Sequence, residues 1–173
     1  MLKIIVFLGG AALMALEMVG SRVLAPHFGS SIFVWGSLIS IFLTALSIGN
    51  YWGGVLADRR PHMSGLGAMM VVPGVWIWLI PFFATGVNDW VASLSLGARF
   101  SPLLASVILF ALPSVFLGTL SPYAIRLEVR AVESVGNTAG RLYALSTAGS
   151  IAGTLVASFF LIPTIGVRNI LHL

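Results

Sequence analysis

The chain has 173 residues, of which 58% are hydrophobic and only 8% carry a charge. Soluble domains carry about 25% charged residues, so this composition excludes a soluble globular protein, and a disordered chain would need low hydrophobicity and high charge. The net charge is +4, but the arginines are scattered between apolar runs, which argues against a nucleic-acid partner. Cysteine is absent, which excludes disulfides, thiolate metal sites and a cysteine nucleophile. A polytopic membrane protein remains.

Five apolar stretches reach the length of about 20 residues that a membrane-spanning helix requires. They cover residues 4–24, 32–56, 65–85, 102–120 and 142–165. The runs are too long for strands and lack the alternation of an outer-membrane barrel. The sequence therefore predicts an all-α bundle of five spans in the lipid bilayer, with residues 1–173 forming a single transmembrane domain.

The segment at residues 121–141, between the fourth and fifth spans, is more polar than its flanks. It places Ile125, Val129 and Val132 on one face at helical spacing. This pattern predicts an amphipathic helix along the cytoplasmic surface, or a cytoplasmic extension of the fourth span.

The distribution of cationic residues predicts the orientation of the chain. With the N-terminus inside, the cytoplasmic side holds Lys3, Arg59, Arg60, Arg126, Arg130 and Arg141, and the outer side holds Arg22, Arg99 and Arg168. Lysine and arginine concentrate on the cytoplasmic side of membrane proteins, so six against three favours a cytoplasmic N-terminus.

Small residues recur at helix-packing spacing in the second and fifth spans. The stripes are Gly36, Ser40 and Thr44; Ala45, Gly49 and Gly53; and Gly149, Gly153 and Ala157. Such stripes let helix backbones approach closely inside lipid, so we expect these two spans at the centre of the bundle. Proline inside a helix removes a hydrogen bond, so Pro73, Pro81 and Pro113 predict kinks in the third and fourth spans.

Two clusters of ionisable residues are candidates for function. Glu17 lies inside the first apolar run, where a carboxylate costs on the order of 2.5–3.5 kcal/mol and needs a partner, a proton or a wet cavity. It either binds a cation or relays protons, or it pairs with an arginine. Asp58, followed by Arg59, predicts a charged latch in which Asp58 caps a helix or pairs with an arginine of residues 121–141. The candidates for a buried ion pair or solute site are Glu17, Arg22, Asp58, Arg59, Arg126 and Arg141.

The sequence carries no pattern for catalysis or metal binding. His27, His62 and His172 lie far apart and away from acid clusters, so we expect no metal site and no cofactor, although a lone imidazole is able to ligate a haem or a chlorophyll. There is no nucleotide-binding loop and no hydrolase nucleophile elbow. We therefore expect a protein that is not an enzyme.

One family resemblance covers nearly the whole chain. Residues 16–31, LEMVGSRVLAPHFGSS, strongly resemble the opening of the membrane domain of spermidine-synthase-like proteins, which are often fused to major-facilitator-type helices. Residues 34–40 (VWGSLIS), 121–126 (SPYAIR) and 140–147 (GRLYALST) resemble the same family, and residues 54–60 are similar to a loop of major facilitator transporters. The resemblance implies a major-facilitator-like partial repeat, with the candidate residues in its characteristic segments. Residues 1–173 contain no segment that resembles the family's cytoplasmic catalytic domain or its sixth helix, so we expect no synthase activity from these residues.

Together these observations predict a non-catalytic module of a bacterial or archaeal inner membrane, which packs against or anchors a protein partner or forms a homo-oligomer. Two alternatives stay open. The first is a half-unit of a transporter for a polyamine or another cationic solute, in which Glu17 binds the amine and the Asp58 hairpin gates. The second is an accessory subunit of a respiratory or photosynthetic complex.

Overall fold

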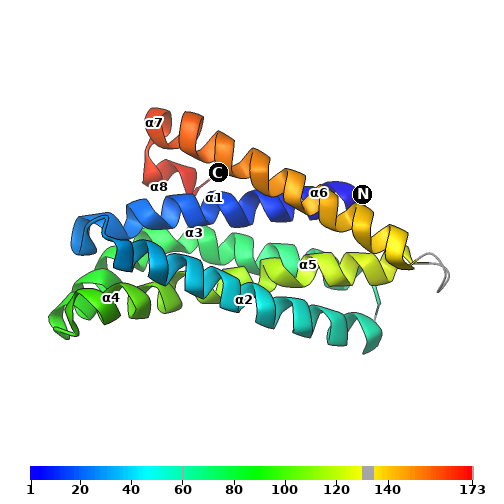
Figure 1. Cartoon of the computed structure of the whole chain (residues 1–173), viewed down its shortest axis with the longest axis horizontal. Helices are drawn as coiled ribbons and strands as arrows, with labels where there is room; N and C mark the ends of the chain where they lie inside the picture. Colours follow the sequence, from blue (N-terminus) through cyan, green and yellow to red (C-terminus); the bar gives the residue numbers. More distant parts are fainter. Residues whose placement is uncertain (60, 130–134, 173) are drawn as a thin grey trace.

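The computed structural model describes residues 1–59, 61–129 and 135–172, and five long helical rods lie along the long axis of that part of the chain (Figure 1). The rods are α1 (Leu2–Phe28); α2 (Ile32–Arg59); α3 (Met63–Ser93); α4 (Gly97–Ser106) with η1 (Val107–Ala111) and α5 (Leu112–Glu128); and α6 (Val135–Val156) with η3 (Ala157–Leu161) and α7 (Ile162–Ile165). A short α8 (Val167–Ile170) folds back. Each rod is long and apolar enough to cross a membrane, which confirms the all-α bundle of five candidate spans.

The described parts of the polar segment at residues 121–141 prolong two rods. Residues 121–128 continue α5, and residues 135–141 begin α6. Of the two interpretations of the sequence, the extension of the fourth span is confirmed for residues 121–128, and a separate surface helix is not formed there. Val132 lies outside the described residues. Continuation is favoured because every added residue closes one more backbone hydrogen bond, whereas a new helix needs a costly nucleus.

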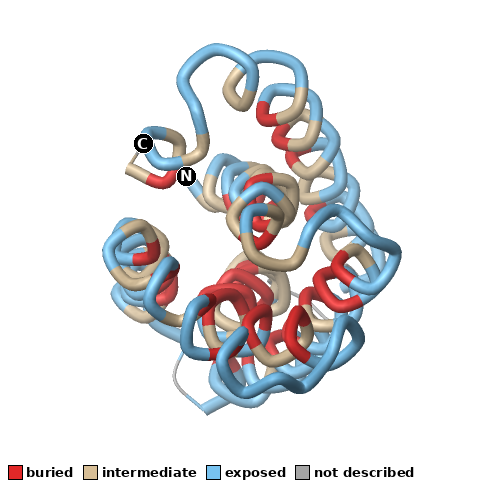
Figure 2. Tube along the Cα trace, turned by 90° about the vertical axis from the view of Figure 1, so that its left-hand side faces the viewer, coloured by how far each residue is buried: buried red, intermediate tan, exposed pale blue. Residues whose placement is uncertain are grey.

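The fourth rod, and not the second or fifth, forms the centre of the bundle. In the most apolar window of the fourth rod 56% of the residues are buried, against 33% in the second and 17% in the fifth. Figure 2 shows the buried positions gathered where the rods meet. Phe110 of η1 is fully buried and its ring lies 5.9 Å from that of Phe42 on α2. The expectation that the second and fifth spans are central is therefore wrong, because each of these spans packs its small residues against a single neighbouring helix.

The stripe Ala45, Gly49 and Gly53 does pack closely, and its partner is α5. A Cβ atom added at Gly53 would lie 2.7 Å from the Cα atom of Thr119, and one added at Gly118 would lie 3.2 Å from the Cα atom of Leu46. Backbone thus meets backbone on both sides of this interface, a contact that only glycine permits.

The stripe Gly149, Gly153 and Ala157 also packs, against α1. A Cβ at Gly149 would collide with the carbonyl of Phe7, and one at Gly153 would lie 2.6 Å from the Cα atom of Ala11. The hydroxyl of Ser150 donates a hydrogen bond to the carbonyl of Gly10 (3.3 Å). This interface is the main attachment of the fifth rod.

The remaining stripe faces away from the bundle. Gly36, Ser40 and Thr44 are exposed, and a Cβ at Gly36 would meet nothing within 4 Å. The prediction that Gly36 and Ser40 pack within this chain is wrong. Only one side of α2 can pack against α5, and that side carries the stripe with Gly49 and Gly53.

Both π-helical turns end two residues before a proline. η1 precedes Pro113, and η3 precedes Pro163. Proline has no N–H and its ring clashes with the carbonyl four residues earlier, so a wider turn relieves the clash. The helical turn therefore widens before Pro113, whereas α3 is one continuous helix through Pro73 and Pro81. The kinks expected at these three prolines stay a prediction. At Pro113 the carbonyl without its usual donor belongs to Leu109, and the indole N–H of Trp76 donates to it (3.0 Å).

Replacing Trp76 by phenylalanine is expected to lower the free energy of unfolding by about 1 kcal/mol, the net contribution of one intramolecular hydrogen bond. In a Pro113→Ala background the backbone regains an N–H for Leu109, so the same substitution should cost less. A double-mutant cycle of SDS-induced unfolding in bicelles measures the difference. Equal costs in the two backgrounds would show that Trp76 acts by packing alone.

Candidate functional site

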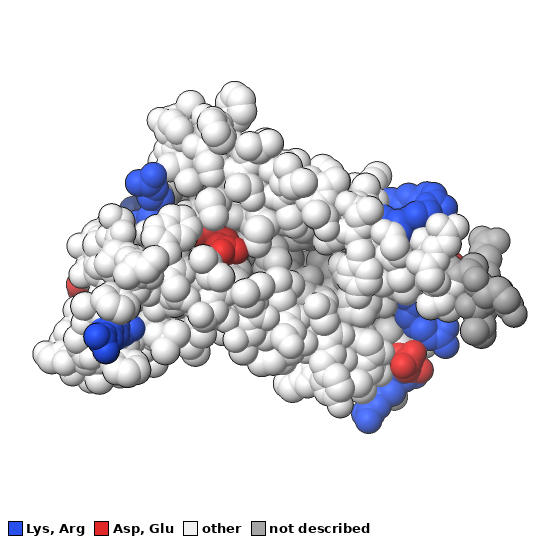
Figure 3. All heavy atoms as spheres, viewed as in Figure 1, with Lys and Arg blue, Asp and Glu red and all other residues white. Residues whose placement is uncertain are grey.

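Charge is concentrated at the two ends of the bundle. Figure 3 shows Lys and Arg at both ends and a broad uncharged surface between them, interrupted by one acidic side chain. At the end where α1 begins, called the N-terminal end from here on, α2 and α5 finish and α3 and α6 start. Its described cations are Lys3, Arg59, Arg126 and Arg141. The opposite end carries Arg99 and Arg168 near helix termini. An apolar band between two charged ends is the arrangement that a bilayer requires.

The predicted latch forms between α2 and α5. Arg126 Nε lies 3.2 Å from Asp58 Oδ1, and it donates a hydrogen bond to that oxygen. The pairing of Asp58 with an arginine of residues 121–141 is therefore confirmed. The pair is not buried as expected, since the side chains of Arg126 and Asp58 are 50% and 75% exposed. Exposed ion pairs contribute little to stability, so this contact orients the two helix ends more than it holds them together.

A second polar contact at the N-terminal end, between Tyr123 and His62, was not predicted from the sequence. The backbone N–H of His62 donates to the hydroxyl oxygen of Tyr123 (3.1 Å), and that hydroxyl donates to the His62 carbonyl (3.1 Å). Tyr123 is almost fully buried on α5 and fits only because Gly65 has no side chain. The turn between α2 and α3 is thus tied to α5 through Asp58 and His62. The sequence signal was weak, because a tyrosine in a half-polar segment has many possible partners.

Glu17 has no ion pair among the described residues, although it is half-buried in the middle of α1. Arg22 is five residues further along, roughly 140° around the helix axis, and it is exposed. The expected buried pair with an arginine is therefore not formed by these two side chains. Arg59 and Arg141 are also exposed and make no ion pair within the described part of the chain.

The opposite end has a polar clamp between α1 and α3 that sequence reasoning missed. His27 Nε2 lies 2.9 Å from Asp89 Oδ1. The neighbouring Asn88 is 1% exposed, and its amide donates to the carbonyl of Val23 (3.2 Å). His27 lies in the last turn of α1, where Asp89 of α3 supplies its partner. The residues are 62 positions apart, and only the polar pair Asn88-Asp89 near the end of an apolar run gave a signal.

The remaining histidine, His172, packs against aromatic rings. Its ring centroid lies 5.6 Å from that of Trp78 and 5.5 Å from that of Phe82. Across residues 1–59, 61–129 and 135–172, no group of three or more His, Cys, Asp or Glu side chains is placed to hold a metal ion.

These features define the class of the protein as an integral membrane protein built as an all-α bundle. Polar contacts join neighbouring helices at both ends of the bundle. Comparison with known protein families, with characterised proteins and with solved structures finds no match to this chain.

Proposed function

We propose that the chain is a non-catalytic membrane module that assembles with a second copy of itself through one face of α2. This docking face consists of Gly36, Ser40, Thr44, Ser47 and Asn50. It supports the proposal because it combines small and polar residues on the outside of the bundle, where an ordinary lipid-facing surface would be apolar.

The docking face is polar and lacks partners. All five residues are exposed, and none of the four polar side chains makes a hydrogen bond within the described part of the chain. They fall within a sector of roughly 120° on α2. Polar groups facing hydrocarbon are costly, and small residues allow another helix to approach. Another transmembrane helix would provide hydrogen-bond partners for the polar groups and would occupy the space beside the small residues.

A second copy fits this face because the face is self-complementary. The amide of Asn50 carries both a donor and an acceptor, so two copies related by a two-fold axis satisfy one another. No charged residue lies between Ile32 and Leu56, so identical faces do not repel. Gly36 provides space where a side chain would separate the helices.

The resemblance of the sequence to spermidine-synthase-like membrane domains supports a role for this assembly. In that role it anchors a synthase-like catalytic partner at the N-terminal end, which faces the cytoplasm of a bacterial or archaeal cell. The greater number of cations at that end supports the orientation. The same resemblance supports the proposal that the bundle is a major-facilitator-like partial repeat.

The test is energy transfer between labelled copies in liposomes. The native chain should form dimers that dilution in lipid dissociates, and Gly36→Leu and Asn50→Leu should each shift the equilibrium strongly toward monomers. Gly74→Leu is the matched control, because Gly74 is an exposed glycine on α3 with nothing within 4 Å of an added Cβ. A native chain that stays monomeric at high protein density contradicts the proposal, as does an equal effect of all three variants.

Glu17 favours a second candidate, a half-unit of a transporter for a polyamine or another cationic solute. The observation is a half-buried carboxylate in the middle of a span, without an ion-pair partner among the described residues. Uptake of labelled spermidine by proteoliposomes should then require the charge of Glu17 and be lost in Glu17→Gln. Equal flux in the two proteins, or no flux above empty liposomes, excludes this role.

A further inference from the structure

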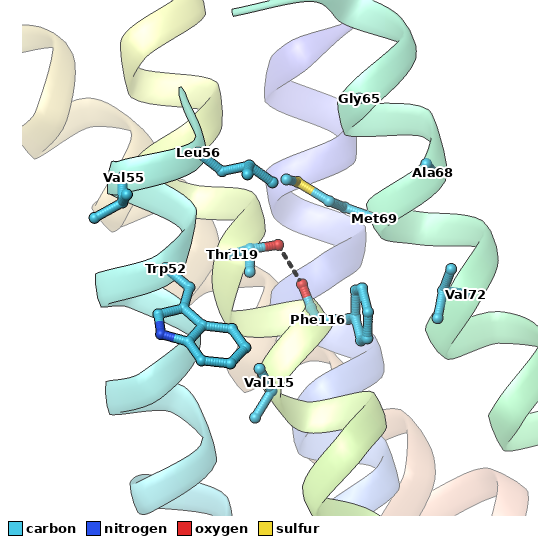
Figure 4. A pocket seen from close by; sticks show the side chains of 10 residues that line it. All are labelled: Trp52, Val55, Leu56, Gly65, Ala68, Met69, Val72, Val115, Phe116 and Thr119. Carbon is cyan, nitrogen blue, oxygen red and sulfur yellow. Dashed lines mark hydrogen bonds between the residues drawn. The ribbon is translucent and has the colours of Figure 1, made fainter. Parts of the chain in front are cut away.

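An apolar groove lies between α2 and α3, with α5 as its floor. Both helices pack on α5, while α2 and α3 scarcely contact each other. The groove encloses about 480 Å³. Figure 4 shows Trp52 and Leu56 of α2 and Met69 of α3 pointing into it from opposite sides, with Phe116 of α5 below. The hydroxyl of Thr119 donates within α5, to the Phe116 carbonyl (2.6 Å), so it is not free for a ligand.

A second pocket, which has polar residues among those that line it, continues the groove at the N-terminal end of the bundle. This headgroup pocket encloses about 670 Å³ and is lined by Leu56, Arg59, His62, Ser64, Gly65 and Tyr123. Leu56 and Gly65 line both spaces, so the groove and the pocket are neighbours. The pocket therefore lies where α2 ends and α3 begins, at the edge of the apolar band.

The charge of Arg59 is available to a ligand. The adjacent carboxylate of Asp58 is engaged by Arg126, and Arg59 has no ion-pair partner within the described part of the chain. Ser64 and His62 line the same pocket, and a hydroxyl and an imidazole are groups that can donate hydrogen bonds. Guanidinium binds phosphate through paired hydrogen bonds, so the pocket is complementary to a phosphate group.

We propose that the groove and the headgroup pocket together bind one anionic phospholipid. Its phosphate lies beside Arg59, and one acyl chain lies along the groove between Trp52 and Met69. A phospholipid is the ligand that presents an anion and an apolar chain at this depth of a bilayer. Trp52 and Leu56 lie on a different side of α2 from the docking face, so the lipid and a second copy do not compete for the same surface.

The energetics predict selectivity for the headgroup. An acyl chain that enters the groove leaves one hydrocarbon environment for another, so burial alone provides no driving force. The groove fits the shape of an acyl chain and prolongs the time that the lipid stays bound. The attraction between Arg59 and the phosphate distinguishes an anionic from a zwitterionic lipid. Inorganic phosphate, which has no chain, would fill only the headgroup pocket.

The experiment is native mass spectrometry of the full chain, titrated with phosphatidylglycerol, phosphatidylcholine or inorganic phosphate. We expect one phosphatidylglycerol retained per chain, in preference to phosphatidylcholine. Arg59→Gln should weaken phosphatidylglycerol binding about fivefold, the effect of one cation at an anionic lipid surface. Arg168→Gln is the matched control, since Arg168 is an exposed arginine outside the pocket whose replacement removes the same charge, and it should leave binding unchanged.

A second pair of variants tests the groove. Ala68→Trp fills it from α3, and Val71→Trp places the same ring at an exposed position that does not line it. Only the first should reduce lipid retention. Equal binding of the two lipids, equal losses in Arg59→Gln and Arg168→Gln, or full competition by inorganic phosphate would overturn the proposal. The arginine pair decides the question even if Ala68→Trp fails to fold.

Discussion

Replacing Gly49 by alanine is expected to lower the free energy of unfolding by about 1–3 kcal/mol, the usual cost of overpacking a closely packed interior. The added Cβ would collide with the carbonyl of Val115 and lie 3.0 Å from the Cα atom of Gly118. These are backbone atoms of α5, so no side-chain rotation relieves the contact. Helices α2 and α5 must move apart, and the buried contact of Phe42 with Phe110 loosens with them.

The control is Gly74→Ala, an equal change at an exposed glycine of α3 with open space around it. It should be neutral or slightly stabilising, because alanine has the higher helix propensity. SDS-induced unfolding in bicelles, followed by circular dichroism, gives both free energies. If the two substitutions had the same effect, the contact between α2 and α5 would not be as close as the structure has it.

Replacing Gly153 by alanine is expected to detach the fifth rod from α1, at a similar cost of about 1–3 kcal/mol. The added methyl group would collide with the backbone of Ala11. Because only 17% of the most apolar window of this rod is buried, α6 has few other contacts to hold it in place. The loss should therefore be local: α6 separates from α1 while the contact of α2 with α5 persists.

Spin-label distances measure this separation, and the absence of native cysteine makes the labelling specific. Labels at Leu8→Cys and Leu155→Cys, both exposed positions, report on α1 and α6. The distance distribution should lengthen and broaden in Gly153→Ala and stay unchanged in Gly140→Ala, where an added Cβ meets nothing within 4 Å. Identical distributions in both variants would contradict the prediction.

Local sequence patterns were sufficient to predict some of the contacts between helices. An ion pair between Asp58 and an arginine of residues 121–141 could be predicted because both segments lie at the end of an apolar run and carry opposite charges, and the structure selects Arg126 as the partner. The stripe of Ala45, Gly49 and Gly53 was recognisable by its spacing. The clamp of His27 with Asp89 and the polar contact of Tyr123 with His62 were not, because each joins segments about 60 residues apart without a local pattern that pairs them.

The sequence by itself determined that five apolar helices form, because span length and backbone hydrogen bonding are local properties of the chain. Only the tertiary structure decided that the fourth rod is central, that Gly153 meets α1, and that Gly36 faces outward. In water, the apolar side of a helix identifies its buried face. In lipid the outside of a bundle is as apolar as the inside, so hydrophobicity does not distinguish them, and close backbone packing selects which helices are neighbours.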